Sequence, residues 1–219
     1  MFTTNKLKTQ KDNNRYSHVY ELDLALIERM KKLIPELQIL LLLYPDYPVE
    51  YFPKEIRDNY IIHAFLNHNV IPETKYNYIY RGDLFENLDK IVKEGNLYDC
   101  VIMTRCIEHL SVNDIIYFFY YMSKIIKPKR GILTLVYPNM DLIVKKLQEL
   151  DPTNQQFIMY NYELFNEGEK YDTHKTFTNK NVIKKLGELE GYFEEIEVKE
   201  NISIESNRDI YNITIFRRT

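Results

Sequence analysis

The stretch from residue 98 to residue 139 constrains the fold of this chain most strongly. It begins with an apolar run at 98–103, continues through a turn into a helix that ends before Pro128, and closes with a second apolar run at 131–137. Short runs that are apolar at successive positions are typical of strands buried on both faces. Two such strands joined by a helix form a parallel crossover unit, so the stretch predicts an α/β fold.

The rest of the chain continues this alternation. Further apolar runs predict strands at 38–43, 60–66, 76–80, 193–198 and 210–216, and the segments between and around them predict helices at 18–34, 85–94, 112–126, 141–150 and 179–189. Ser111 and Asp114 resemble a capping box, Thr178 is the expected cap of the last helix, and Gly95 is expected to end the helix before it. The last two strands are separated only by a loop and must pair antiparallel. We expect a doubly wound, mostly parallel seven-stranded sheet with a C-terminal antiparallel hairpin, formed by one domain at 17–219 after a polar tail at 1–16.

Composition limits the function classes. The 219 residues carry a formal net charge of −3 with no long basic run, which argues against an extended nucleic-acid surface and favours a small or local acceptor. The two cysteines, Cys100 and Cys106, are expected to be reduced core residues and cannot alone hold a metal. There is no apolar segment of signal-peptide type, and the longest apolar run, 39–43, is too short to cross a bilayer. We therefore expect a cytoplasmic protein without a membrane partner.

Three short motifs carry a family resemblance. The strand at 98–103 is followed by Glu108, His109 and Leu110, the helix is followed by Lys-Pro-Lys-Arg-Gly at 127–131, and the next strand closes in Pro138 and Asn139. This order resembles the second half of a class I S-adenosylmethionine-dependent methyltransferase. A loop histidine, a helix and Gly-Tyr-Phe at 191–193 resemble the family's C-terminal part. The resemblance implies a Rossmann-like fold and S-adenosyl-L-methionine as cofactor.

In an open parallel sheet, ligands bind at the carboxyl ends of the strands. The resemblance places the cofactor's amino group near Tyr44 and Asp46, its ribose near Asn67 and its adenine near Asp83. Asp46 and Asp83 also fit ordinary turn residues, and Asn67 also fits a solvated loop residue. Thr104, Arg105 and Glu108 are expected to line the site after the fourth strand, although Arg105 also fits a surface cation.

Two histidines are candidate catalytic residues. His109 can act as a general base, although the resemblance assigns the Glu108 and His109 pair mainly to shaping the loop, and helical geometry predicts that the two side chains turn to different sides. His174 lies in a polar loop where family members place a lid, so it is a candidate for contact with the acceptor or a solvated loop histidine. No group of His, Cys or Asp has metal-ligand spacing along the chain.

The leading hypothesis is methyl transfer to an oxygen or nitrogen nucleophile. The alternative is a catalytically inactive, methyltransferase-like binding or scaffold subunit. It rests on the loop Tyr-Pro-Asp-Tyr-Pro at 44–48, which stands where the family has glycines. Pro45 and Pro48 remove two amide donors, and bulky side chains there can fill the space that glycine leaves to the cofactor.

Overall fold

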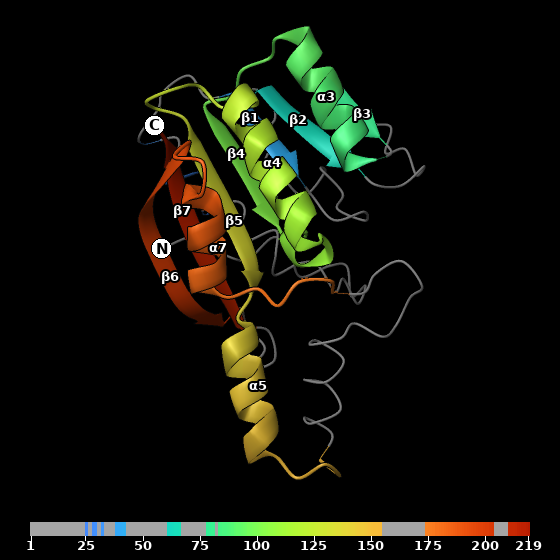
Figure 1. Cartoon of the computed structure of the whole chain (residues 1–219), viewed down its shortest axis with the longest axis vertical. Helices are drawn as coiled ribbons and strands as arrows, with labels where there is room; N and C mark the ends of the chain where they lie inside the picture. Colours follow the sequence, from blue (N-terminus) through green and yellow to red (C-terminus); the bar gives the residue numbers. More distant parts are fainter. Residues whose placement is uncertain are drawn as a thin grey trace, which may run out of the picture.

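Figure 1 shows the fold in a computed structural model of the chain. The structure describes residues 38–42, 61–66, 78–81, 83–154, 174–203 and 210–219, together with the helical residues 25, 28, 29 and 32. The predicted tail at 1–16 and the proline-containing loop at 44–48 lie outside the described residues. Among the helices of the described part, none has the length and apolar character needed to cross a membrane.

The strands form one sheet in the order β3-β2-β1-β4-β5-β7-β6. Strands β1 to β5 pair in parallel, whereas β7 runs antiparallel to both β5 and β6. The carboxyl ends of the parallel strands therefore meet at one edge. The strand bounds are β1 Gln38–Leu42, β2 Ile61–Leu66, β3 Tyr78–Arg81, β4 Cys100–Thr104, β5 Ile132–Pro138, β6 Phe193–Ser203 and β7 Ile210–Arg218. The predicted α/β architecture is confirmed.

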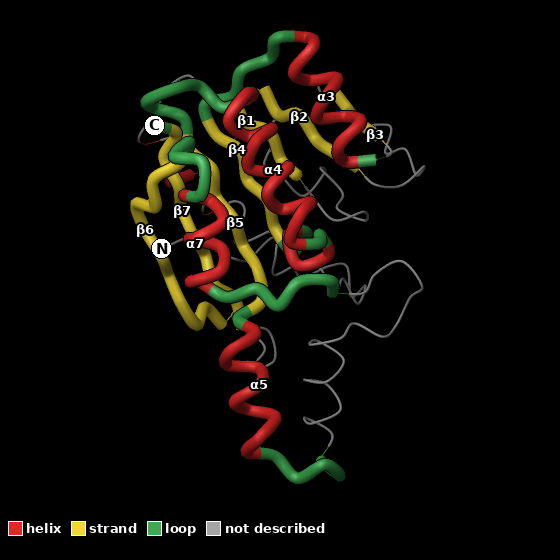
Figure 2. The backbone as a smooth tube through the Cα atoms, viewed as in Figure 1, coloured by secondary structure: helices red, strands yellow, loops and turns green. Residues whose placement is uncertain are grey.

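Three of the helices lie on the same face of the sheet, as Figures 1 and 2 show. These are α3 (Leu84–Glu94), α4 (Val112–Ile125) and α7 (Lys180–Glu188). Helix α5 (Met140–Glu149) continues from β5 and projects away from the sheet, and a 3-10 helix, η2 (Ile107–His109), follows β4. The carboxyl edge of the sheet is thus bordered by η2, the first turn of α4 and the start of α5.

Local sequence signals set most of the helix ends. The capping box is present as predicted: the Ser111 hydroxyl accepts from the Asp114 amide, and the Asp114 carboxylate accepts from the Ser111 amide. Gly95 ends α3 with a φ of 74°, a conformation that glycine adopts without penalty. The predicted cap at Thr178 is wrong. Asn179 caps α7 through its bond from the Val182 amide, while the Thr178 hydroxyl is buried and donates to the Pro138 carbonyl.

The central strands are buried on both faces, as their short, mainly apolar runs predict. On one face, Leu40, Val101 and Leu133 join a hydrophobic cluster that includes residues of α3, α4 and α7. Ile39 and Ile102 occupy alternate positions on β1 and β4, so they point to the opposite face, and both are 0% exposed. Burial on both faces makes this part of the sheet a rigid support for the loops at its carboxyl edge.

The Lys-Pro-Lys-Arg-Gly segment has a structural role at the amino end of the sheet. Asp99 is 1% exposed, and its carboxylate accepts from the Gln38 amide at 3.1 Å and from the Lys127 ammonium at 2.7 Å. Gly131 is required because a Cβ there would lie 2.4 Å from the Cγ2 atom of Ile126. These contacts connect β1, β4 and the loop before β5 at the edge opposite the candidate site.

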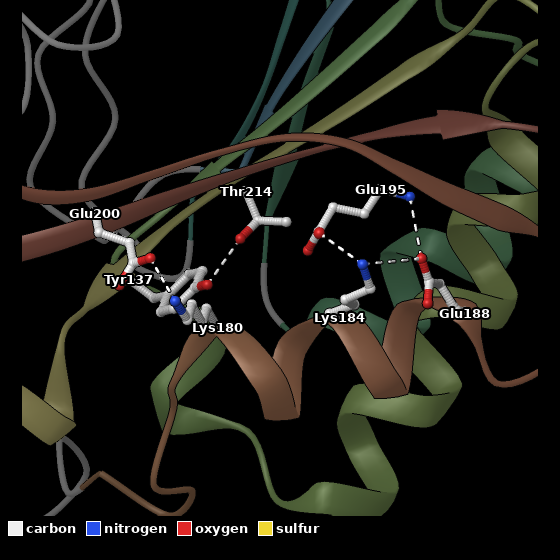
Figure 3. A network of polar contacts seen from close by, with 7 residues as sticks. All are labelled: Tyr137, Lys180, Lys184, Glu188, Glu195, Glu200 and Thr214. Atoms are coloured by element: carbon white, nitrogen blue, oxygen red, sulfur yellow. Dashed lines mark hydrogen bonds and ion pairs between the residues drawn. The ribbon is translucent and has the colours of Figure 1, made fainter.

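Helix α7 is fixed to β6 by ion pairs, which Figure 3 shows. Lys180 pairs with Glu200 at 2.5 Å, and Lys184 pairs with Glu195 at 2.9 Å. The Lys180–Glu200 pair is exposed and contributes little to stability, whereas the Glu195 carboxylate of the second pair is half-buried. The ion pairs nevertheless position α7 along β6 and, with it, the segment that precedes the helix.

Candidate active site

The carboxyl end of β4 carries an unusual backbone conformation. Thr104, the last residue of the strand, is 2% exposed, and Arg105 follows with a φ of 53°. A residue with a Cβ pays roughly 1 to 3 kcal/mol for this left-handed conformation. The Arg105 amide donates to the Val136 carbonyl at 2.9 Å, and its guanidinium lies 5.6 Å from the ring centroid of Tyr211. Arg105 is therefore held between β5 and β7 and is only half exposed.

The turn after Arg105 brings a carboxylate and an imidazole toward one point. Glu108 and His109 belong to η2, and Glu108 is 0% exposed. The prediction that these two side chains turn to different sides is wrong, because one ligand atom of each lies within 4.8 Å of the other. The 3-10 helix is only three residues long. Its three residues per turn separate consecutive side chains by about 120°, so the approach of Glu108 and His109 comes from the torsions of their own side chains and not from the backbone.

A segment distant in sequence completes this arrangement. Residues 174–179 run across the carboxyl ends of β4 and β5 before α7 begins, as Figure 2 shows. The amides of Lys175 and Thr176 both donate to the Glu108 carbonyl, at 2.9 and 3.2 Å, and the Thr176 hydroxyl donates to the Leu110 carbonyl at 2.5 Å. Together with the bond from the Thr178 hydroxyl to Pro138, these contacts hold the segment against η2.

His174 lies at the start of that segment and meets His109. The two rings pack edge to face with their centroids 4.8 Å apart. His174 is half-buried rather than fully solvated. Glu108, His109 and His174 form a histidine–carboxylate cluster, in which one ligand atom from each residue lies within 4.8 Å of the others. Spacing along the chain did not reveal this group, because His174 comes from a separate segment.

Asp83 stands at the carboxyl end of β3, as predicted, and it caps α3. Its Oδ1 atom accepts from the amides of Phe85 and Glu86, at 2.8 and 3.1 Å. The side chain is exposed, and Oδ2 accepts no hydrogen bond from the described residues. Asp83 therefore has the structural role of a turn residue that caps α3. The second carboxylate oxygen fits the exocyclic amine of an adenine, so the proposed contact with the cofactor stays a prediction.

Two reactive groups near these strands are structural. Burial raises the pKa of the Cys100 thiol to about 12, with a smaller contribution from the neighbouring Asp99 charge. Burial also raises the pKa of Tyr137, whose hydroxyl forms a 2.7 Å hydrogen bond with Thr214, as Figure 3 shows. Neither group ionises near neutral pH.

The other predicted cofactor contacts, Tyr44, Asp46 and Asn67, lie outside the described residues.

Comparison with solved structures places this sheet among known folds. A SAM-dependent methyltransferase from Archaeoglobus fulgidus superposes with a TM-score of 0.59 over 91% of this chain and 94% of that chain, at 14% identity. A protein from Pyrococcus horikoshii OT3 superposes with a TM-score of 0.60 over 94% of this chain and 93% of that chain, at 15% sequence identity. The chain has the fold of the class I S-adenosylmethionine-dependent methyltransferases.

A third structure with this fold was determined with a ligand. It is the magnesium protoporphyrin IX methyltransferase from Synechocystis PCC 6803 with bound SAH, with a TM-score of 0.55 over 92% of this chain and 82% of that chain, at 11% identity. No protein-family model matches this sequence, and no curated protein matches it in a sequence search. At identities this low, the likeness establishes the fold, and function has to be argued from the site.

Proposed function

We propose that this protein transfers the methyl group of S-adenosyl-L-methionine to an oxygen or nitrogen nucleophile of a small or locally presented acceptor. The observation that carries the proposal is the position of the histidine–carboxylate cluster. It lies directly after β4, at the edge of a methyltransferase-type sheet where ligands of open parallel sheets bind. This edge also carries Asp83 and the strained Arg105.

The residues at this edge fit the cofactor. Asp83 offers its exposed carboxylate to the adenine amine, while Thr104, Arg105 and Glu108 stand at and just after the carboxyl end of β4, with Arg105 the most exposed of the three. Tyr44, Asp46 and Asn67 are proposed to contact the methionine and ribose groups. Bound S-adenosylmethionine supplies a methyl group on a positively charged sulfur, so that transfer breaks the carbon–sulfur bond and leaves S-adenosylhomocysteine. The protein has to align the acceptor and accept its proton.

His109 and His174 are the proposed acceptor-facing groups. Imidazole accepts a proton near neutral pH, and the buried Glu108 carboxylate lies close enough to orient one ring. The backbone bonds from residues 175 and 176 to the Glu108 carbonyl hold together the two segments that carry the rings. Such positioning is what a reaction limited by alignment requires.

Calorimetric titration of S-adenosylmethionine and S-adenosylhomocysteine into the full chain tests this function. We expect one site with a dissociation constant in the range of about 1 μM to 1 mM, in which working enzymes bind their substrates. Absence of heat up to millimolar cofactor would reject the proposal and favour the inactive scaffold, whose pocket is closed by the bulky loop at 44–48.

A variant at Asp83 tests the assigned adenine contact. Asp83→Asn keeps an Oδ1 acceptor for the α3 cap and replaces the second oxygen by an amide donor. We expect weaker cofactor binding by about 1 to 3 kcal/mol, the value of a charge-assisted hydrogen bond. The matched control is Asp89→Asn on the same helix, which breaks an exposed ion pair with Lys93 and should leave binding unchanged. Equal binding by Asp83→Asn and the parent would remove Asp83 from the site.

A further inference from the structure

We propose that Glu108, His109 and His174 bind one divalent transition-metal ion of the zinc class. The histidine–carboxylate cluster brings one nitrogen or oxygen ligand atom of each residue within 4.8 Å of the other two. The ligands come from two parts of the chain, η2 and the 174–179 segment, that are joined by hydrogen bonds. These residues alone form the metal site, which does not depend on cofactor binding.

The ligand set selects the class of metal. Two imidazoles and one carboxylate are the protein ligands of many catalytic zinc sites, which keep a fourth position open. Magnesium and calcium prefer oxygen ligands alone, and the set contains no thiolate that would favour copper(I). Cys106 lies nearby, but its sulfur contacts the carbonyls of Thr104 and Leu42, at 3.3 and 3.8 Å. The cluster therefore fits zinc better than it fits a hard cation.

The separations suit a site that tightens on metal binding. Ligands about 2.0 to 2.1 Å from a tetrahedral zinc lie roughly 3.4 Å from one another. In the structure the ligand atoms of the three residues lie within 4.8 Å of one another, so they must approach by at most about 1.4 Å to reach that spacing. Rotation of the side chains can supply this movement. The backbone segments that carry the ligands are already joined, because the Glu108 carbonyl accepts from the amides of Lys175 and Thr176.

Burial also favours a cation at this point. Both carboxylate oxygens of Glu108 and the Nδ1 atoms of His109 and His174 are shielded from solvent. A buried carboxylate is stabilised by a nearby positive charge, which a divalent ion supplies at short range. The competing arrangement is an ion pair between Glu108 and a protonated histidine, with no metal. That arrangement predicts no affinity for zinc.

An open fourth position gives the metal a role in the proposed function. A hydroxyl oxygen of the acceptor bound there loses its proton more easily, because a divalent cation stabilises the negative oxygen. This role rests on the proposed methyl transfer, whereas metal binding itself does not. With the metal bound, each imidazole uses its free lone pair on the ion, so the hydroxyl proton passes to solvent water, and the two histidines position the acceptor instead of serving as its base.

Metal binding is measured on the full chain, stripped with chelator, freed of any affinity tag and without cofactor. Zinc is titrated calorimetrically, magnesium serves as the hard-cation comparison, and cobalt(II) is added as a visible spectroscopic probe. We expect one zinc per chain, no comparable magnesium binding, and cobalt absorption bands of a four- or five-coordinate site. No zinc heat together with no such bands would overturn the proposal and leave the ion pair as the explanation of the cluster.

Two variants locate the site. His174→Ala should weaken zinc binding by about 100-fold or more and abolish the cobalt bands, since it removes one of three ligands. The matched control, Lys175→Ala, alters the exposed neighbouring side chain but keeps the amide that bonds Glu108, and should bind zinc like the parent. Unchanged zinc binding by both His174→Ala and His109→Ala would also overturn the proposal. Failure here leaves the cofactor titration unaffected, so the two proposals are separable.

Discussion

Gly187 of α7 offers a test of the packing that positions the candidate site. A Cβ at this position would lie 2.7 Å from two ring atoms of Phe216 and 3.1 Å from one ring atom of Phe119. Ordinary carbon contacts are about 3.5 to 4.0 Å, so the overlap with Phe216 is roughly 1 Å. The rings cannot easily retreat, because Phe216 is 0% exposed and packs edge to face with Phe119 and with Phe193.

Two effects of Gly187→Ala oppose each other. Alanine favours a helix interior over glycine by about 1 kcal/mol. Overpacking of a well-filled core costs about 1 to 3 kcal/mol. Because the close contact is to two ring atoms that are themselves enclosed, we expect the upper part of that range and a net loss of about 1 to 2 kcal/mol. The free energy of unfolding in urea measures this directly.

A control variant and a double variant separate the effect of helix preference from the effect of overpacking. Lys185→Ala places alanine at an exposed position of the same helix and should change stability by less than about 0.5 kcal/mol. Gly187→Ala combined with Phe216→Leu should be more stable than the sum of the two single changes predicts, since the smaller side chain relieves the overlap. A Gly187→Ala protein as stable as the parent, or more stable, would refute the packing described for α7.

Three further predictions concern other parts of the structure. In the folded protein, Cys106 should react with a thiol reagent before Cys100, because Cys100 is fully buried with its pKa raised to about 12; equal rates would contradict this burial. The hydrogen bond from Arg29 lowers the pKa of Glu197 below its ordinary value of 4.5, so the pair contributes stability above that pH and loses it as the pH falls through the folded-state pKa. The difference in unfolding free energy between the parent and Glu197→Gln should therefore be under about 1 kcal/mol at pH 7 for this partly exposed pair and vanish in acid. Thr176→Val removes a hydrogen bond to the turn after β4 and should lower stability by about 1 kcal/mol, whereas an unchanged urea midpoint would show that this bond does not hold the 174–179 segment.

Local signals made most of the fold predictable. The short, mainly apolar runs at 38–43, 98–103 and 131–137 indicate buried strands, and β1, β4 and β5 lie within two residues of those bounds. The last strands were harder to delimit. Strand β6 extends to Ser203 because it pairs along β7, and the irregular pairing after Glu195 and Lys199 disrupts the alternation that marks a strand in sequence.

The candidate site was predictable only in part. Glu108 and His109 were found because they stand together in a turn after a strand. Their meeting with His174 depends on hydrogen bonds between residues far apart in sequence, which spacing along the chain cannot reveal. The prediction of the α7 cap was wrong for a related reason. Thr178 and Asn179 are both good capping residues, and burial of Thr178 against Pro138 decided between them.

The most direct test of the central claim is to follow backbone amide resonances while S-adenosylmethionine is added to the isotope-labelled protein. We expect the amide resonances at the carboxyl ends of the parallel strands to shift, including those of Asp83, Thr104 and Arg105. Amides at the opposite edge, around Asp99 and Lys127, should not move. No shifts at millimolar cofactor, or shifts confined to the opposite edge, would contradict a cofactor site at the carboxyl edge of this sheet.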